Sequence, residues 1–297
     1  MDLNLQEQIT GVNGPLSGEK IVEVNSINGG CIHLAWKIKL ATGQEFFAKT
    51  SSREHFLMLE YEASGLTALN KQIDQDYLII PKPIALQQLE TSAILILPWI
   101  EFVQGNEKKL GQGLALLHQQ SSIHHQENFG WGADGFIGSN PQIMGWNKSW
   151  GKCFVELRLT PQIEMAKQWN LSFDQAKFRT NLIKYLEKHN PIPSLVHGDL
   201  WNGNAAMHKN GKGILFDPAT WWADREVDIA MTKLFGGFSQ NFYESYESTW
   251  ELPAGHQERV AIYNLYHILN HANLFGGGYK NRAITSIKAI NSLLEKY

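Results

Sequence analysis

The stretch LVHGDLWNGN, residues 195–204, decides how the rest of the chain is interpreted. It contains a carboxylate at Asp199 and, five positions later, an amide at Asn204. Two groups at this spacing can divide the work of a phosphoryl transfer, because the carboxylate accepts a hydroxyl proton while the amide oxygen helps to hold a magnesium ion. The stretch therefore predicts Asp199 as a catalytic base and Asn204 as a metal ligand.

A second carboxylate, Asp217, follows the short apolar run at residues 214–216 and is predicted as a further metal ligand. The order of these groups matches the catalytic loop and the metal-binding aspartate of kinases, except that Gly198 replaces the usual arginine. Aspartate and glycine also favour ordinary turns, which is the alternative interpretation of Asp199 and Asp217. All four polar groups of the motif fall in register, however, so the pattern favours a kinase-fold phosphotransferase with ATP and Mg²⁺ as cofactors.

The composition is that of a folded, soluble protein, with 43% hydrophobic and 19% charged residues in 297 positions. This length suits one large domain or two lobes. The formal net charge of −3 argues against a nucleic-acid partner, which would require a basic surface. The N-terminal stretch lacks a signal-peptide pattern, and the apolar run at residues 93–100 is too short for a membrane helix. We therefore expect a cytoplasmic protein without a membrane partner.

The N-terminal part is predicted to form a phosphate-binding hairpin. Apolar and polar residues alternate over residues 32–40, which predicts a half-buried strand, and residues 45–50 form a second strand that contains Lys49. Gly29 and Gly30 precede the first strand, where the absence of a side chain lets backbone N–H groups approach a phosphate. A glycine pair alone is weak evidence, but together with Lys49 it follows the order of kinase parts.

A helix is predicted over residues 55–69, where apolar residues recur on one face. In kinases the helix after the lysine strand supplies a glutamate that orients the lysine. Glu62 is the first candidate for pairing with Lys49, and Glu60 is the second. Either residue would be an ordinary solvated helix charge if the lysine strand did not precede it.

The predicted strands at residues 77–80 and 93–97 lead to a hinge between two lobes. In a two-lobed kinase the backbone of this segment recognises adenine. Pro98 has no N–H group, so the donor to adenine is expected from Trp99 or Ile100, with Leu97 as a further contact.

Helices are predicted at residues 110–119, 260–274 and 283–294, with two more between residues 154 and 189. The segment 128–150 is rich in glycine and tryptophan, and we interpret it either as a wall of the binding site or as surface packing under a long loop. His118, His124 and His125 lack metal-site spacing, so they are expected to be structural or at the surface. No A-P-E segment with a phosphosite is present in the sequence, which predicts a constitutively active enzyme.

The predicted fold is α+β and bilobal, like that of protein kinases. Residues 1–100 are expected to form a nucleotide-binding lobe with an antiparallel sheet and one helix. Residues 101–297 are expected to form the larger, mainly helical lobe that carries catalysis and substrate binding.

The wider sequence closely resembles the fructosamine kinase family, also called the ketosamine-3-kinases. The segments that carry the resemblance are HGDLWNGN, FDPATWW, DREVDIAMTKLFGGF and YNLYHILNHANLFGGGY, together with NGGCIHLAW and the central FGWGADGFIGSNPQ. They span nearly the whole chain. Aminoglycoside and choline kinases share the HGD and second-aspartate pattern but lack these flanking aromatic residues.

The resemblance implies ATP-dependent phosphorylation of the sugar 3-hydroxyl of ketosamines, such as ribulosamine, erythrulosamine or fructosamine adducts. The phosphorylated adduct is unstable and releases the amine, so the implied role is protein deglycation, with small ketosamines or glycated proteins as partners. Bacterial and plant relatives favour shorter sugars, so a ribulosamine is expected to be a better acceptor than a fructosamine. By the same resemblance Asp199 is the base, Lys49 contacts the nucleotide phosphates, and Asp228 braces the catalytic loop.

Two positions depart from the family pattern: Pro98 stands where many relatives have glutamate, and Ala223 stands where many have glycine. The first affects how adenine is recognised, and the second is expected to reshape the sugar pocket. The alternative is a kinase of another small metabolite, such as an aminoglycoside or choline. A cationic acceptor of that kind would need a markedly acidic pocket, whereas the segment 128–150 contains Asp134 as its single acidic residue.

The two cysteines have different expected behaviour. Cys31 lies in the predicted glycine loop near Lys49, where positive surroundings would stabilise a thiolate and favour oxidation. It is therefore predicted to be redox-sensitive, so that the protein is a monomer or a redox-linked dimer through Cys31; the alternative is a small apolar loop residue. Cys153 lies in a predicted helix with apolar neighbours and is expected to be inert.

Overall fold

A five-stranded antiparallel sheet forms the N-terminal lobe, in the order β1-β2-β3-β6-β5. Its strands are β1 (Ile21–Ile27), β2 (Leu34–Leu40), β3 (Glu45–Ser52), β5 (Ala85–Gln88) and β6 (Ser92–Pro98). The computed structural model describes residues 1–27, 33–123 and 126–297. The predicted roles of Gly29, Gly30 and Cys31, and the expectation for His124 and His125, therefore lie outside the described residues.

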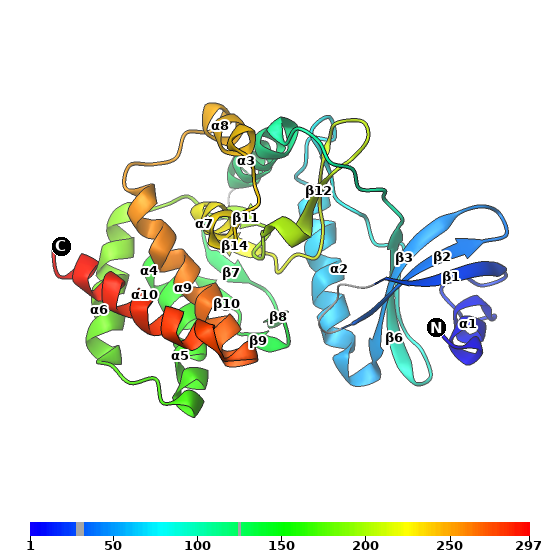
Figure 1. Cartoon of the computed structure of the whole chain (residues 1–297), viewed down its shortest axis with the longest axis horizontal. Helices are drawn as coiled ribbons and strands as arrows, with labels where there is room; N and C mark the ends of the chain where they lie inside the picture. The colour runs from blue at the N-terminus through cyan, green and yellow to red at the C-terminus, as the bar shows by residue number, and fades with distance from the viewer. Residues whose placement is uncertain (28–32, 124–125) are drawn as a thin grey trace.

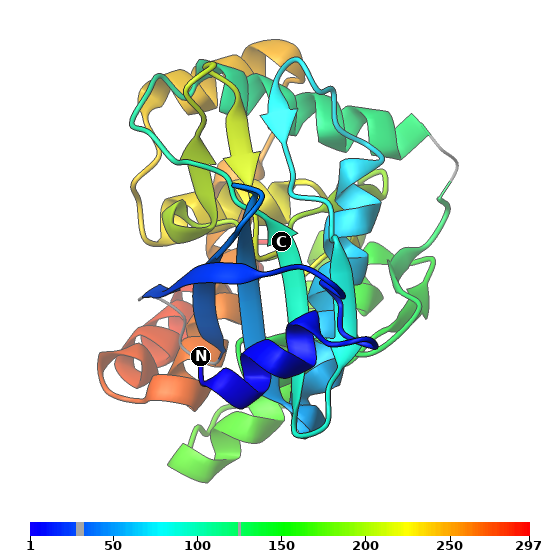
Figure 2. The ribbon, with the colours of Figure 1, turned by 90° about the vertical axis from the view of Figure 1, so that its right-hand side faces the viewer.

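The N-terminal lobe contains two helices where the sequence predicted one. Helix α1 (Leu3–Thr10) begins at Asp2, whose carboxylate accepts the backbone N–H of Leu5 at 2.8 Å. Its Ile9 is fully buried against the sheet residues Ile38 and Leu40. Figure 2 shows α1 lying across the outer face of the sheet. The helix was missed because eight residues carry too few apolar positions for a clear helical period.

Helix α2 (Phe56–Asn70) covers the other face of the sheet and lies between the two lobes (Figure 1). The helix confirms the prediction for residues 55–69. Its Tyr61 hydroxyl donates to the Thr220 carbonyl of the C-terminal lobe at 2.8 Å and accepts from Gln142 Nε2 at 2.9 Å. At Gly65 an added Cβ would lie 2.9 Å from Thr220 Oγ1, so glycine permits this close approach. These contacts fix α2 against the catalytic lobe.

The C-terminal lobe is mainly helical, as predicted, and is built around two apolar cores. The larger one lies within this lobe, and the second contains α3 and α8 and continues into α2 of the N-terminal lobe. Its helices are α3 (Lys108–Ile123), α4 (Trp150–Phe154), α5 (Thr160–Ala166), α6 (Gln175–His189), α7 (Glu226–Leu234), α8 (Gln240–Thr249), α9 (His256–Phe275) and α10 (Gly278–Leu294). The sequence predicted α3, α6, α9 and α10 well, whereas α8 was not predicted.

Short strands position the catalytic segments of this lobe. One sheet has the order β10-β7-β14-β11, another has the order β12-β13-β4, and β8 pairs with β9. The strands are β4 (Leu78–Ile79), β7 (Phe129–Trp131), β8 (Gly135–Ile137), β9 (Asn140–Gln142), β10 (Gly145–Asn147), β11 (Ser194–Val196), β12 (Ala205–Met207), β13 (Gly213–Leu215) and β14 (Trp221–Ala223). The segment 128–150 thus forms two short antiparallel strand pairs, β7 with β10 and β8 with β9.

The boundary between the two lobes does not follow the chain strictly at residue 100. Strand β4 falls in the range predicted for the N-terminal lobe, but it pairs in parallel with β13, with Leu78 opposite Gly213 and Ile79 opposite Ile214. The chain therefore crosses into the catalytic lobe directly after α2 and then returns to complete the N-terminal sheet.

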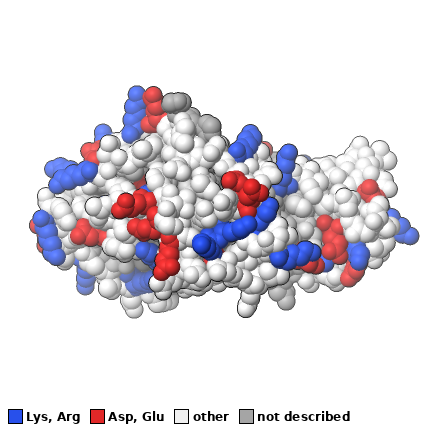
Figure 3. Space-filling view, turned by 90° about the horizontal axis from the view of Figure 1, so that it is seen from above, with Lys and Arg blue, Asp and Glu red and all other residues white. Residues whose placement is uncertain are grey.

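The surface has charges of both signs. Figure 3 shows lysine, arginine, aspartate and glutamate side chains interspersed over the face that it presents. That face, where the structure describes it, lacks the extended basic surface that a nucleic-acid backbone requires. None of the helices in the described ranges is both long enough and apolar enough to cross a membrane.

Candidate active site

A cleft of about 780 Å³ lies between the two lobes and collects most of the predicted site residues. The predicted residues that line it are Lys49, Glu62, Leu97, Trp99, Asp199, Asn204 and Asp217. They come from β3, α2, the hinge, the catalytic loop and the segment after β13. Tertiary structure thus joins groups that lie up to 168 residues apart in the chain.

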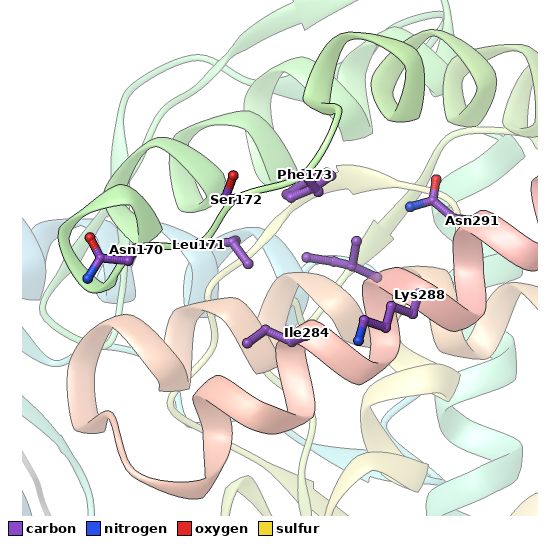
Figure 4. Close-up of a pocket in the computed structure, with 8 residues that line it drawn as sticks. Asn170, Leu171, Ser172, Phe173, Ile284, Lys288 and Asn291 are labelled. Carbon is purple, nitrogen blue, oxygen red and sulfur yellow. The ribbon is translucent and has the colours of Figure 1, made fainter.

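A second cavity of about 180 Å³ lies between residues 170–173 and α10 (Figure 4). Leu171, Phe173 and Ile284 contribute apolar surface, and Lys288 is its one charged lining group. The described lining of this cavity contains no carboxylate or histidine, so it offers no general base for a proton transfer. The chemistry therefore belongs to the cleft between the lobes.

The catalytic loop has the backbone shape that explains Gly198. This residue has φ +82°, and an added Cβ would lie 2.1 Å from the carbonyl oxygen of Ala219. Glycine is therefore required where other kinases have arginine. The Asp228 carboxylate accepts the backbone N–H groups of His197 at 2.7 Å and Gly198 at 2.8 Å. Asp228 thus has the bracing position that was predicted from the family resemblance.

Behind Asp228 lies a buried polar network that the sequence did not reveal. His118 Nε2 is 3.1 Å from Asp228 Oδ2, and His118 Nδ1 is 2.9 Å from the Tyr246 hydroxyl. Arg225 donates to the same hydroxyl at 3.0 Å. Burial lowers the pKa of His118, so its ring is held neutral. His118 is structural, one of the two roles expected for it.

Asp199 has the environment of a base that works near neutral pH. Burial raises the pKa of Asp199 to about 7, and the nearby charge of Asp217 acts in the same direction. Asn204 Nδ2 donates to the Asp199 backbone carbonyl at 2.9 Å and approaches its Oδ2 at 3.3 Å. This orientation leaves the Asn204 amide oxygen available to a metal ion, while Asp199 remains available to an acceptor hydroxyl.

The predicted pair of Lys49 and Glu62 is formed. Lys49 Nζ donates to the two carboxylate oxygens of Glu62 at 2.9 and 2.8 Å, and to Asp217 Oδ1 at 2.7 Å. Burial alone would lower the pKa of Lys49, but the carboxylates of Asp217 and Glu62 outweigh it and raise the pKa. Glu60 is exposed and has no part in this arrangement.

Asp217 is held in a strained conformation with φ +57°, which costs a non-glycine residue about 1–3 kcal/mol. Its side chain is 52% exposed, so the carboxylate is open to the cleft. Burial would raise the pKa of Asp217, but the Lys49 ammonium outweighs this effect and lowers it. A carboxylate and the Asn204 amide oxygen are hard oxygen ligands of the kind that Mg²⁺ prefers, so the residues fit that ion.

The backbone of the hinge distinguishes the two amides that were predicted as adenine donors, those of Trp99 and Ile100. The Trp99 N–H donates to the Glu45 carbonyl at 3.3 Å and is therefore used within the sheet. The Ile100 N–H, the other predicted donor, has no partner among the described residues. Trp99 and Leu97 line the cleft, and of the two amides predicted as donors the hinge geometry favours Ile100 over Trp99.

The far end of the cleft is aromatic and contains residues that the sequence did not single out. Phe235 contacts Trp201 and His271 with ring centroids 6.2 and 5.1 Å apart, and His271 contacts Phe275 at 5.5 Å. Among the described cleft residues, the carboxylates are those of Glu62, Asp199 and Asp217. This end therefore lacks the acidic surface that a polycationic acceptor would require.

Two expectations about single residues can now be judged. Ala223 is fully buried in β14 and does not line the cleft, so the expectation that it reshapes the sugar pocket is wrong. Cys153 is fully buried, and burial raises the pKa of its thiol to about 12, which agrees with an inert residue.

Two lobes, a strand lysine paired with a helix glutamate, and a braced catalytic loop followed by a second aspartate define a protein-kinase-like phosphotransferase. The solved choline kinase LicA from Streptococcus pneumoniae has this fold, with a TM-score of 0.61 at 16% identity over 99% of this chain and 98% of that chain. The family model described as Fructosamine kinase matches residues 5–294. The chain therefore belongs to the fructosamine kinase family and is a kinase that uses an alcohol group as acceptor.

Several relatives support this assignment. The chain is 40% identical over 273 residues to a Synechocystis protein named "Probable ketoamine kinase", covering 91% of this chain and 90% of the relative. It is 35% identical over 275 residues to "Protein-ribulosamine 3-kinase, chloroplastic" of Arabidopsis thaliana, covering 90% and 82%. The crystal structure of a "Putative fructosamine-3-kinase" from Haemophilus somnus 129PT superposes with a TM-score of 0.83 at 28% identity, covering 92% of each chain.

Proposed function

We propose that this kinase phosphorylates the sugar 3-hydroxyl of ketosamines, with ATP as donor and Mg²⁺ as cofactor, and thereby promotes deglycation. One observation carries the proposal: the predicted phosphoryl-transfer residues that the structure describes, Lys49, Asp199, Asn204 and Asp217, line the same cleft as an aromatic, acid-poor end. The names of the relatives in Synechocystis and Arabidopsis point to the same class of acceptor.

The nucleotide half of the cleft holds ATP through charge and backbone contacts. Lys49 binds the phosphates while Glu62 keeps its ammonium in place. The Ile100 N–H and the Pro98 carbonyl present a donor and an acceptor to the edge of adenine. The Asn204 amide oxygen and the Asp217 carboxylate would hold Mg²⁺, which would supply positive charge to neutralise the phosphates.

Asp199 performs the proton transfer. Its carboxylate accepts the proton of the acceptor hydroxyl while that oxygen forms a bond to the γ-phosphorus and the bond to the leaving ADP breaks. The effects of substituting Asp199 and Lys49 are therefore separable, because the base acts on the acceptor and the lysine acts on the nucleotide.

An assay of ADP release tests the proposal with ribulose-lysine, fructose-lysine, choline and kanamycin as acceptors. We expect the ketosamines to give the highest kcat/KM, with the ribulosamine above the fructosamine, and NMR of the product to locate the phosphate on the 3-oxygen. Asp199→Asn is the control for background hydrolysis of ATP. A higher kcat/KM for choline or kanamycin would reject the proposed acceptor class.

The deglycation step needs a separate measurement. A ribose-glycated protein is incubated with the kinase and ATP, and the mass of the adduct is followed with time. We expect the adduct to gain the mass of a phosphoryl group and then to disappear. Adducts that are phosphorylated but remain on the protein would contradict the deglycation role while leaving the kinase reaction intact.

A further inference from the structure

His267, in the middle of α9, is a buried histidine beside the catalytic base. Its residue exposure is 5%, and its Nδ1 lies 3.9 Å from Asp199 Oδ1. This nitrogen is buried without a hydrogen-bond partner among the described residues. A buried polar atom without a partner costs about 1–3 kcal/mol, and such atoms are rare in folded proteins. His267 was not singled out in the sequence, because 68 positions separate it from Asp199 and no local spacing links the two.

The charge and the proton position of the ring follow from its surroundings. Burial lowers the pKa of His267 to about 3, so the ring is neutral at pH 7. Asp199 must be ionised to act as a base, which requires a pH above its raised pKa of about 7. In that state, a lone pair on Nδ1 would face the lone pairs of the Asp199 carboxylate. A proton on Nδ1 instead directs an N–H group toward Oδ1, so the Nδ1–H form of the neutral ring is favoured.

Asp199 has only long contacts to its side-chain partners. Its Oδ2 has a long contact of 3.3 Å with Asn204 Nδ2, and its Oδ1 is 3.9 Å from His267 Nδ1. A hydrogen bond between nitrogen and oxygen normally spans about 2.9 Å, so the second contact is roughly 1 Å too long. A small movement of the carboxylate would therefore bring it within hydrogen-bond distance of His267 on one side and would shorten its contact with Asn204 on the other.

We propose that His267 is a positioning residue for Asp199. When the acceptor binds, the Nδ1–H group of His267 donates to Asp199 Oδ1 and fixes the plane of the carboxylate, which leaves a lone pair of Oδ2 directed at the acceptor hydroxyl. His267 contacts neither ATP nor the acceptor and takes no proton. The inference rests on the proposed role of Asp199 as the base.

Three substitutions separate positioning from packing. Asparagine can place an N–H group where Nδ1 lies, whereas glutamine places it where Nε2 lies and leucine offers none. We expect His267→Leu and His267→Gln to lower kcat about 100-fold with an unchanged KM for ATP, as for a reacting group displaced by 1 Å. His267→Asn should stay within about fivefold of wild type.

The matched control is His256→Leu at the start of α9, which lies outside the cleft and should leave kcat unchanged. Thermal unfolding of each variant verifies that it is folded. Equal losses in the asparagine and glutamine variants, or an unchanged kcat in the leucine variant, would overturn the positioning role.

A second measurement does not depend on the acceptor. In ¹⁵N-histidine-labelled wild-type protein at a pH of about 8.5, above the raised pKa of Asp199, the signal that disappears in His267→Asn should report a protonated Nδ1 and a bare Nε2. A bare Nδ1 would overturn the inference even if ketosamines are phosphorylated. Conversely, wild-type protein that phosphorylates no ketosamine would reject the proposed function while leaving this tautomer measurement valid.

Discussion

The two halves of the cleft are built on different physical principles. In the nucleotide half, Lys49 contacts three carboxylate oxygens at 2.7 to 2.9 Å, and α2 is tied to both lobes. In the acceptor half, Phe235 and Phe275 are 38% and 58% exposed and contact their neighbours mainly through ring faces and edges. Buried charges must be fully partnered, so the first half is fixed before ligands bind. The second half selects by shape and carries little fixed charge.

The largest effect is expected where the two halves meet, at Asp199. Asp199→Asn should lower kcat by about 10³ to 10⁴, because general-base catalysis is lost, and should leave the KM for ATP nearly unchanged. Steady-state kinetics with each substrate varied in turn provides the measurement. A kcat within a few-fold of wild type would remove Asp199 from the base role.

The next effect tests the charged half alone. Lys49→Ala should lower kcat about 100-fold and also raise the KM for ATP, because the lysine stabilises the phosphates both in the bound state and during transfer. The acceptor KM should not change. A variant in which the acceptor KM rises and the ATP KM stays constant would contradict the division of the cleft into two halves.

The third prediction tests whether the His267 ring beside Asp199 is shielded from water. The pKa of His267 is lowered by burial to about 3 in the folded state, whereas an unfolded histidine titrates near 6.5. Below pH 6.5 the histidine therefore binds a proton in the unfolded chain but stays neutral in the folded chain. The free energy of unfolding consequently decreases as the pH falls. Between pH 7 and 5, wild type should lose about 2 kcal/mol more unfolding free energy than His267→Asn.

Urea unfolding of the two proteins at several pH values measures this difference. Both proteins share every other titrating group, so the difference reports His267 together with any change in the pKa of the adjacent Asp199. Parallel pH dependence of the two unfolding free energies would mean that water reaches the ring.

The smallest effect is expected in the acceptor half. Phe275→Ala should raise the KM for a ketosamine about tenfold, the equivalent of one lost aromatic contact, with kcat and the ATP KM nearly unchanged. Tyr297→Ala is a control for the loss of an exposed aromatic residue, since Tyr297 lies outside the cleft. An unchanged acceptor KM would show that the aromatic end does not contact the substrate.

Much of the reacting set could be predicted from the sequence. Lys49, Asp199, Asn204 and Asp217 occur in kinase order with fixed local spacing, and Glu62 follows Lys49 on the next periodic helix. Such features are local: a strand or helix shows its period over about ten residues, and the spacing of a motif is fixed by one loop. The bilobal fold follows from the same order of elements.

The remaining features depend on contacts between distant segments. Only the tertiary structure decided that α1 covers the sheet, that β4 joins the catalytic lobe, and that the Trp99 amide is used by Glu45. The same holds for His267, which reaches Asp199 because α9 packs beside the catalytic loop. A sequence pattern reports which face of an element is apolar, but it does not report which distant partner that face meets. The sequence therefore determined the reacting groups, and packing decided what surrounds them.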